Sequence, residues 1–152
     1  MPSRPPFTVA IPLRSIAEPF VPPLQELAVS NCRLVTLEQI DYLVKLKRLW
    51  ADRNQIKKIN LTFTDLTLLD LKKNALFEVP DLSGCPNLKE LDLSGNKIRG
   101  VWSGLISSSR LQKLNMSKNK VKWDRELWGA SMGIAQGLYG LQELNLLGNK
   151  GT

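Results

Sequence analysis

A pattern of eleven residues occurs six times in this chain of 152 residues, and it limits the possible folds more than any other feature. The copies begin at Leu24, Leu46, Leu66, Leu88, Leu111 and Leu141, with separations of 22, 20, 22, 23 and 30 residues. The copies follow LxxLxLxx(N/C)xL, with Ala51 in place of a leucine in the second copy and Gly151 in place of the last apolar residue in the sixth, and the central LxL has the period-two alternation of a short strand. Because one copy can bury its leucines only against its neighbours, the repeat predicts a solenoid.

The pattern resembles the leucine-rich repeat over about residues 24–149, and residues 76–98, LFEVPDLSGCPNLKELDLSGNKI, are similar to its SDS22-like class. The resemblance implies an α/β solenoid: a horseshoe with a concave parallel β-sheet and convex 3₁₀ or irregular turns. Apolar residues recur every three positions between the strands, as from Leu76 to Leu88, which is the period of a 3₁₀-helix. The class also implies an intracellular setting, since similar repeats occur in phosphatase regulators, splicing factors, tubulin cofactors and axonemal proteins.

Position nine of the pattern is a column of amides with one exception. An asparagine side chain offers two donors and an acceptor, so we expect this column to satisfy the turn backbone of adjacent coils. Cys32 takes the place of asparagine in the first copy and is predicted to be a small buried thiol, and Cys85 falls on the apolar stripe of a convex turn. The column consists of Cys32, Asn54, Asn74, Asn96, Asn119 and Asn149.

Outside the regular repeats, the sequence predicts a proline-rich lead-in and cap at residues 1–23 and an insertion at residues 122–139 within the repeat domain, 24–152. A short helix beginning near Asp124 is expected in the insertion, and a binding loop that presents Trp123 and Trp128 is the alternative. In the last copy, Leu144 and Leu146 are expected near an uncovered end of the core, so either further chain or a partner covers them.

Catalysis and membrane insertion both find little support in the sequence. The chain has no histidine, which removes the commonest general base and most zinc or iron sites. We see no metal-ligand cluster and expect no cofactor and no enzymatic activity. No apolar run reaches the roughly 18 to 20 residues of a membrane span, and only two cysteines are present. These observations favour a cytoplasmic binding protein, with a cytoskeletal, ciliary or nuclear location as alternatives.

The outward positions of the strands are the expected binding surface, and Trp50 is the most distinctive residue on them. An outward tryptophan with basic neighbours has the composition of an interface hot spot, although it can also simply cover its neighbours' aliphatic stems. We therefore predict a protein partner with an acidic or mixed-charge surface, and a ribonucleoprotein role is the less favoured alternative. The predicted partner-binding residues are Arg48, Trp50, Arg53, Leu68, Asp70, Lys72, Lys73, Asp92, Lys113 and Asn115.

Overall fold

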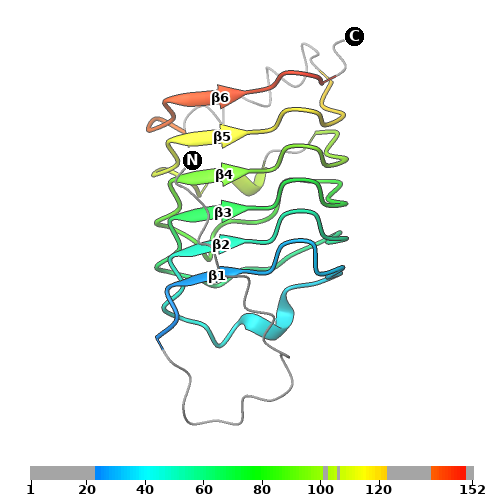
Figure 1. Cartoon of the computed structure of the whole chain (residues 1–152). Coiled ribbons are helices and arrows are strands. Elements are labelled where there is room, and N and C mark those ends of the chain that lie inside the picture. The colour runs from blue at the N-terminus through cyan, green and yellow to red at the C-terminus, as the bar shows by residue number, and fades with distance from the viewer. Residues whose placement is uncertain (1–22, 101–102, 106, 123–137, 150–152) are drawn as a thin grey trace.

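The computed structural model describes residues 23–100, 103–105, 107–122 and 138–149, which form a stack of coils, each with one short strand (Figure 1). The predicted cap (apart from Pro23) and the predicted insertion helix with Trp123 and Trp128 lie outside these residues. The strands are β1 (Glu26–Ala28), β2 (Arg48–Trp50), β3 (Leu68–Asp70), β4 (Glu90–Asp92), β5 (Lys113–Asn115) and β6 (Glu143–Asn145).

The six strands form one parallel sheet in sequence order, β1 to β6. Equivalent repeat positions lie opposite each other, as where Leu49 pairs with Leu27 on one side and Leu69 on the other. This register follows from the pattern, because a slip of one residue would turn every buried leucine to the other face of the sheet. The predicted solenoid with a concave parallel sheet is therefore confirmed.

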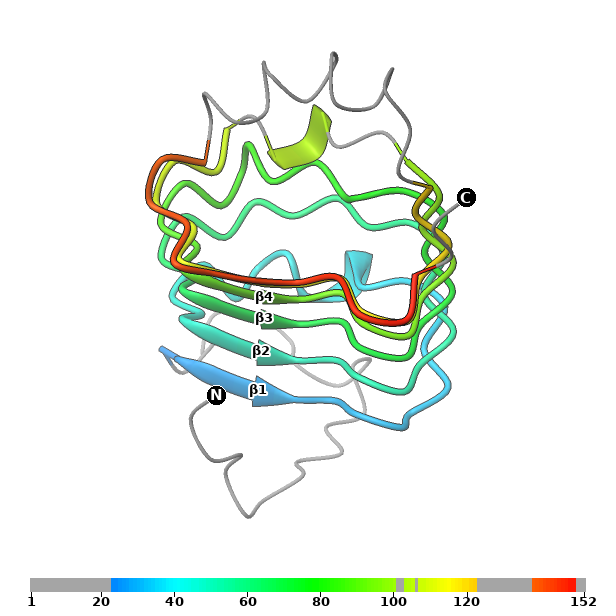
Figure 2. The ribbon, with the colours of Figure 1, turned by 90° about the horizontal axis from the view of Figure 1, so that it is seen from above.

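The core lies between the sheet and the opposite limb of each coil (Figure 2). Side chains at positions four and six of the pattern point into it, and those of Leu49, Leu69, Leu71 and Leu93 are fully buried. Burying one leucine side chain contributes roughly 2 kcal/mol, and each coil does so only because the next coil covers it. Ala51, which replaces leucine in the second copy, is also fully buried, so the substitution does not interrupt the core.

The asparagine column ties neighbouring coils together as predicted. The Asn96 amide donates to the carbonyls of Leu71 (2.9 Å) and Leu93 (2.8 Å), and its oxygen accepts from the Leu76 N–H at 3.1 Å. Each asparagine thus bonds to its own turn and to the coil before it, and Asn54, Asn74, Asn119 and Asn149 repeat the arrangement.

Cys32 departs from the prediction, because it is exposed and not buried. The asparagines reach back to a preceding coil, and the described part of the chain has no coil before the first. Position nine of the first copy therefore has no preceding carbonyl to bond among the described residues, and it joins the ladder only through its backbone N–H, which donates to Asn54 Oδ1 at 2.9 Å. Cys85, in contrast, is buried in the core as expected.

In the described part of the chain, the convex side contains two single-turn 3₁₀-helices, η1 (Glu38–Ile40) and η2 (Ser103–Leu105), which lie across the coils from the strands (Figure 2). The period-three stripe of residues 76–88 forms no helix. It is built instead from separate turns, in which Cys85 N–H bonds to the Leu82 carbonyl (2.9 Å) and Leu88 N–H bonds to the Cys85 carbonyl (3.1 Å). These turns bury the same apolar face that a longer 3₁₀-helix would bury.

The backbone turns sharply after every strand, just before the ladder position. The residue there has a positive φ of 54–74° in all six coils, a left-handed conformation that glycine adopts most easily. Glycine occupies it in two coils, and side chains are tolerated in the other four. These residues are Asn31, Arg53, Lys73, Gly95, Lys118 and Gly148.

The last coil is open on one side. Among the described residues none stacks on β6, and Leu144 and Leu147 are 47% and 77% exposed. Leu146 is only partly buried. The expectation that this end of the core is uncovered is confirmed for the part of the chain that the structure describes.

Candidate functional site

The concave face of the sheet carries the side chains that alternate with the buried leucines. Positions three and five of each copy point to this face, and the strand register stacks them into two columns. Position three gives Glu26, Arg48, Leu68, Glu90, Lys113 and Glu143. Position five gives Ala28, Trp50, Asp70, Asp92, Asn115 and Asn145.

The face over β1–β3 carries an apolar cluster of Ala28, Trp50 and Leu68 beside three charged side chains, and we call it the concave apolar cluster. The cluster is separate from the main core, since the sheet backbone lies between them. Trp50 is nevertheless only 4% exposed and Leu68 only 3%. On one side, an ion pair between Arg48 and Glu26 borders the cluster.

The face over β4–β6 is hollowed and polar, and we call this hollow the polar groove. Its volume is about 490 Å³. Lys113 Nζ lies 2.9 Å from Glu143 Oε1, and this contact, with a smaller contribution from Glu90, raises the pKa of Lys113. Glu90 Oε2 is buried and has no hydrogen-bond partner among the described residues. The polar side chains that line the groove are Glu90, Asp92, Lys113, Asn115, Gln142, Glu143 and Asn145.

Three of the predicted site residues also have a structural role. The side-chain oxygen of Asp70 accepts a hydrogen bond from the backbone N–H two residues later, at 2.9 Å, and those of Asp92 and Asn115 do the same at 2.8 and 3.1 Å. This is the Asx turn, which stabilises the sharp bend after a strand. Asp92 Oδ2 also accepts from Asn115 Nδ2 at 3.1 Å, which links β4 to β5.

Carboxylates crowd the middle of the concave face. Burial raises the pKa of Asp70 to about 6, the backbone hydrogen bond from Lys72 opposes this shift, and the nearby charges of Asp92 and Asp52 add to it. Asp52 is itself buried, and its carboxylate accepts from the Ser30 hydroxyl. At neutral pH the site therefore holds negative charge in a poorly solvated environment.

The basic residues are placed differently from the acidic ones. Positions three, five and seven hold six carboxylates (Glu26, Asp52, Asp70, Glu90, Asp92, Glu143) against three bases (Arg48, Lys72, Lys113), a net charge of −3. Other bases sit beside the face and not on it. Lys47 and Lys89 precede the strands, and Arg53, Lys73 and Lys118 lie in the turns that follow them. The concave face is thus an acidic strip between two basic edges.

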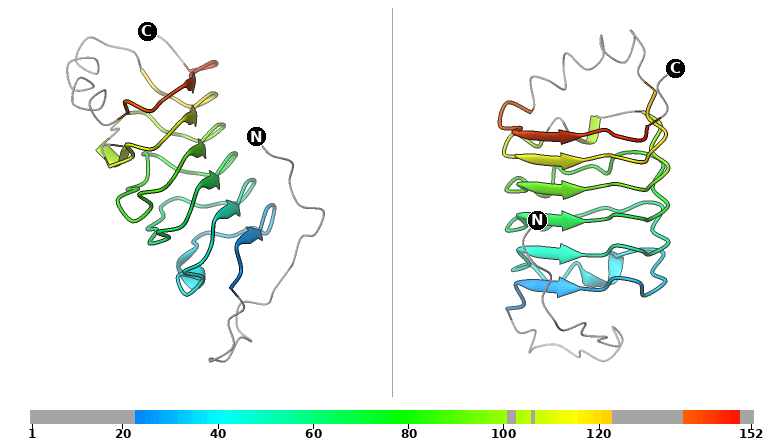
Figure 3. Two further views of the ribbon diagram at one scale, coloured as in Figure 1. Left: turned by 90° about the vertical axis from the view of Figure 1, so that its left-hand side faces the viewer. Right: turned by 45° about the horizontal axis from the view of Figure 1, so that its top comes forward.

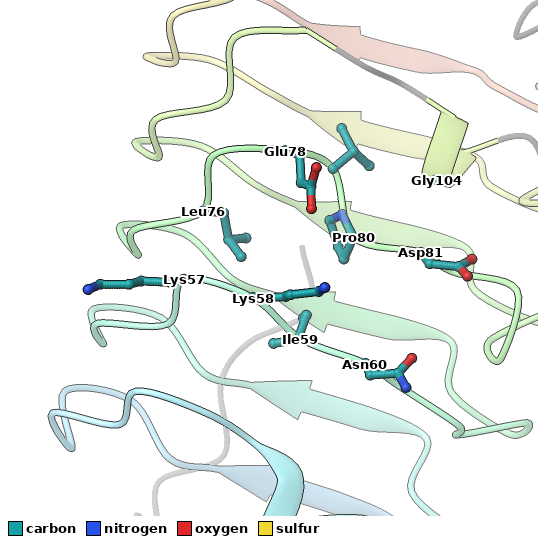
Figure 4. A pocket seen from close by; sticks show the side chains of 10 residues that line it. Lys57, Lys58, Ile59, Asn60, Leu76, Glu78, Pro80, Asp81 and Gly104 are labelled. Carbon is teal, nitrogen blue, oxygen red and sulfur yellow. The ribbon is translucent and has the colours of Figure 1, made fainter.

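A second hollow, of about 580 Å³, lies on the convex side between the second and third coils (Figure 4). Lys57 and Lys58 line it from one coil, and Glu78 and Asp81 line it from the next. Gly104 closes one end, where a Cβ would come within 2.2 Å of the Pro80 carbonyl oxygen. Exposed side chains of both signs make up its rim, and we assign it no function.

Metal binding and membrane insertion find no site in the described ranges. No group of three or more Cys, Asp or Glu side chains there is placed to hold a metal ion. No helix among the same residues is long and apolar enough to cross a bilayer.

Comparison with known proteins identifies the fold. The model of the leucine-rich repeat family matches residues 64–121. Internalin C2 of Listeria monocytogenes superposes with a TM-score of 0.69 and 31% identity, over 84% of this chain and 54% of that one. The fold is a leucine-rich-repeat solenoid.

The sequence relatives are much longer chains, and this chain matches a part of each. Acidic leucine-rich nuclear phosphoprotein 32 family member A of Drosophila melanogaster is 34% identical over 92 residues, which is 52% of this chain and 35% of the relative. Protein NUD1 of Saccharomyces cerevisiae is 35% identical over 105 residues, 66% of this chain and 12% of the relative. Across the curated relatives that it matches, the chain spans from 5% to 35% of their length.

The solenoid separates the predicted site residues into three groups. Trp50 and Leu68 lie in the concave apolar cluster, with Arg48 beside them, and Asp70 follows on β3. Asp92, Lys113 and Asn115 line the polar groove. Lys72 comes two residues after Asp70, whereas the turn residues Arg53 and Lys73 lie at the edge of the face, with Arg53 Nε 3.6 Å from Asp52 Oδ2.

Sequence reasoning missed four residues of the groove: Glu90, Gln142, Glu143 and Asn145. The signal was present in the repeat columns, because Glu90, Glu143 and Asn145 stand at positions three and five, while Gln142 stands at position two, at the edge of the face. The predicted site was instead centred on Trp50 and its basic neighbours in the second and third coils. The position-eight glycines of two copies also signalled that Arg53 and Lys73 belong to a turn.

Proposed function

We propose that this chain is an adaptor that binds an extended segment of a protein partner in the polar groove over β4–β6. The single observation that carries the proposal is the groove itself, a hollow of about 490 Å³ lined by side chains from three adjacent strands. Leucine-rich-repeat solenoids generally use such extended concave surfaces to bind other proteins. Binding, and not catalysis, is the function that this geometry supports.

The groove favours a partner segment rich in hydrogen-bond donors. It holds Glu90, Asp92 and Glu143 against the single base Lys113, a net charge of −2. A basic or amide side chain placed between Glu90 and Lys113 would satisfy the buried oxygen of Glu90, which is otherwise costly to leave unpaired. Acidic groups of the same partner would meet the turn lysines, so the partner surface is of mixed charge.

The setting of this adaptor belongs to the same proposal. The SDS22-like character of residues 76–98 favours an intracellular assembly of the cytoskeletal, ciliary or phosphatase-regulating kind. The word nuclear in the name of the Drosophila relative keeps a nuclear location among the alternatives. Partners identified by the experiment below would decide between these settings.

The experiment compares two charge reversals on opposite sides of the solenoid. A partner is captured with the wild-type chain and then titrated against Glu143→Lys, in the groove, and Glu78→Lys, on the convex side. We expect Glu143→Lys to weaken binding at least tenfold, because it removes an acceptor and adds a charge that repels a basic segment, and Glu78→Lys to leave binding within twofold. Equal affinity of the two variants, or a loss confined to Glu78→Lys, would contradict the proposal.

A ribonucleoprotein role is the alternative, and the concave face disfavours it. Three more carboxylates than bases at positions three, five and seven would repel phosphate. RNA would instead contact the bases at the edges of the face, such as Lys73 and Lys118. Titration with a single-stranded RNA at rising salt separates the two functions, because tight binding with a steep log-log salt slope would favour RNA.

A further inference from the structure

The turns that follow the strands stack into one edge of the solenoid (Figure 3, right). In each of the first five copies, the position-eight N–H donates to the position-seven carbonyl of the next coil. At position ten, Lys97 N–H bonds to the carbonyl of Leu76 in the coil before it at 2.9 Å, and at position twelve Arg99 N–H bonds to the Phe77 carbonyl at 3.4 Å. Positions eight, ten and twelve of these five copies therefore form three columns, which we call the turn edge.

The turn edge carries many bases and no carboxylate. Of its fifteen positions, nine are basic and six are uncharged, so it holds a charge of +9. The whole chain has a net charge of only +7, which leaves −2 for all the other residues. Position thirteen, next to this edge, adds Lys58 and Glu78, whose charges cancel. The nine bases, all of them exposed, are Arg33, Arg53, Lys57, Lys73, Lys97, Arg99, Lys118, Lys120 and Lys122.

These bases have few partners of their own. Within the described ranges, Arg53 is the only one of the nine in an ion pair, with its Nε 3.6 Å from Asp52 Oδ2. Lys97 Nζ lies over the Phe77 ring, 5.6 Å from its centroid. Like charges that line up in columns without counter-charges create a local positive potential. The turn edge is therefore a surface that attracts an anionic ligand.

The opposite edge, which leads into the strands, does not have this charge pattern. Lys45 Nζ lies 3.9 Å from Asp65 Oδ2, so at least one base there has a counter-charge. Position two forms the column on this side, and its only bases in six copies are Lys47 and Lys89. The two edges share the same coils and differ in charge, so the opposite edge provides a matched control.

The uncharged residues of the turn edge favour a protein ligand over a nucleic acid. Surfaces that bind single strands combine bases with several aromatic side chains, on which successive nucleobases stack. Phe77 is the only aromatic residue among the fifteen positions, and Lys97 lies over its ring. Phe77 and Val35 are 52% and 55% exposed and stand in the same column at position twelve. They offer apolar contacts between the bases, which suit the mixed side chains of a polypeptide.

We propose that the turn edge is a second docking surface and that its occupant is an extended, acidic segment of a protein. The carboxylates of this segment pair with the turn lysines and arginines, and its apolar side chains contact Phe77 and Val35. Five coils at roughly 4.8 Å give the edge a length of roughly 19 Å, which about six extended residues span. The inference rests on the proposed function only in taking a protein as the partner, because the site lies outside the polar groove.

The test measures the affinity of the full chain for a fluorescein-labelled oligoglutamate peptide, by fluorescence anisotropy at physiological ionic strength. Lys97→Glu plus Lys120→Glu reverses two charges of the turn edge in adjacent coils and should weaken binding at least tenfold. The control, Lys47→Glu plus Lys89→Glu, changes the net charge by the same amount on the opposite edge and should weaken binding less than threefold. Far-UV circular dichroism verifies that each variant is folded.

A neutral pair of substitutions covers the case in which the charge reversals disturb the fold. Lys97→Gln plus Lys120→Gln removes the same two charges and keeps polar side chains of similar length. We expect it to weaken oligoglutamate binding at least threefold. Unchanged affinity of this pair would contradict the inference.

Three further results would overturn the inference. The first is the absence of oligoglutamate binding by the wild-type chain. The second is equal weakening by the turn-edge pair and the opposite-edge pair, because binding would then depend on net charge and not on this surface. The third is tighter binding of a single-stranded RNA with the same number of charges, because the occupant would then be a nucleic acid.

Glu143→Lys distinguishes a failure of this inference from a failure of the proposed function. It changes the polar groove and not the turn edge, so it should weaken the captured partner without lowering the affinity for oligoglutamate. If the captured partner tolerates Glu143→Lys while the turn-edge pair still loses oligoglutamate, the groove proposal fails and the turn edge stands. The reverse pattern contradicts the turn edge and leaves the groove intact.

Discussion

The two halves of the concave face have the same backbone and different surfaces. Over β1–β3, three of the six outward positions at three and five hold Ala28, Trp50 and Leu68, which are buried, and the other three hold Glu26, Arg48 and Asp70. Over β4–β6, the same positions hold amides and charged groups that line an open groove. The inward leucines and the asparagine ladder are alike in both halves. The fold therefore depends on one set of repeat positions and the binding surface on another.

The ladder is common to both halves, and breaking it should have the largest effect. Asn96→Ala removes two bonds to the Leu71 and Leu93 carbonyls and one from the Leu76 N–H. We expect it to lower the free energy of unfolding by about 3 kcal/mol or more, because buried backbone groups lose their partners. Urea unfolding followed by circular dichroism measures this loss. A change below about 1 kcal/mol would mean that the ladder does not hold the coils together.

Truncating the side chain at position five should then lower the free energy of unfolding by different amounts in the two halves. Trp50→Ala is expected to destabilise the chain by about 3 kcal/mol, since the side chain is 4% exposed. Asn115→Ala, at the equivalent position of the groove, loses bonds to Ser117 N–H and Asp92 and should cost about 1 kcal/mol. The same unfolding assay compares the two variants. Equal losses would show that the apolar half is no more buried than the polar half.

Asp70, which lies where the two halves meet, should make the stability of the chain depend on pH. Its folded pKa of about 6 lies above the usual 3.8, so the folded chain binds a proton more tightly than the unfolded chain. The contribution of Asp70 to stability is therefore full below pH 3.8 and is lost as the pH rises through 6. Asp70→Asn keeps the bond from Lys72 N–H and should stabilise the chain by about 1 kcal/mol at pH 7.5, after discounting for its partial exposure.

Urea unfolding at pH 7.5 and at pH 3.5 checks the sign of the change in stability that Asp70→Asn causes. The gain from Asp70→Asn should vanish at the lower pH, where the wild-type carboxyl is protonated. Asp81→Asn serves as the control, because Asp81 lies on the convex side and its pKa is lowered by the Ser83 hydrogen bonds. A destabilised Asp70→Asn chain at pH 7.5 would contradict the raised pKa of Asp70 in the folded chain.

The smallest expected effect concerns the turn that both halves share. Lys118 has a φ of 54° where Gly95 and Gly148 stand in other coils. Lys118→Gly should stabilise the chain by about 0.5 kcal/mol, since relief of the left-handed strain exceeds the added entropy of the unfolded chain. Gly95→Lys should have the opposite sign, and thermal unfolding of both variants provides the comparison. Two changes of the same sign would rule out strain as the cause.

The sequence predicted the parts of the fold that depend on the repeat. The strands, their register and the ladder follow from positions four, six and nine, which meet the same neighbours in every coil. Cys32 was predicted incorrectly, because it is exposed and no coil precedes it among the described residues, and the pattern itself does not specify this neighbour. The repeat pattern could not predict the burial of Trp50 either, because no position of the repeat covers the outward face of the sheet.

The candidate site was less predictable than the fold. Outward positions are free of the packing constraint, so their roles depend on how neighbouring side chains combine across strands. Asp92 and Asn115 show this, because each makes an Asx turn and they also bond to each other between β4 and β5. The prediction that Trp50, Arg53 and Lys73 contact a partner stays a prediction.

Lysine reactivity tests the central claim most directly. The chain is labelled with an acetylating reagent, alone and with the captured partner bound, and the modified lysines are quantified by mass spectrometry. The account predicts that Lys113, in the polar groove, loses several-fold reactivity while Lys57 and Lys58, on the convex side, keep theirs. Protection of Lys57 and Lys58 with an unchanged Lys113 would contradict a concave binding site.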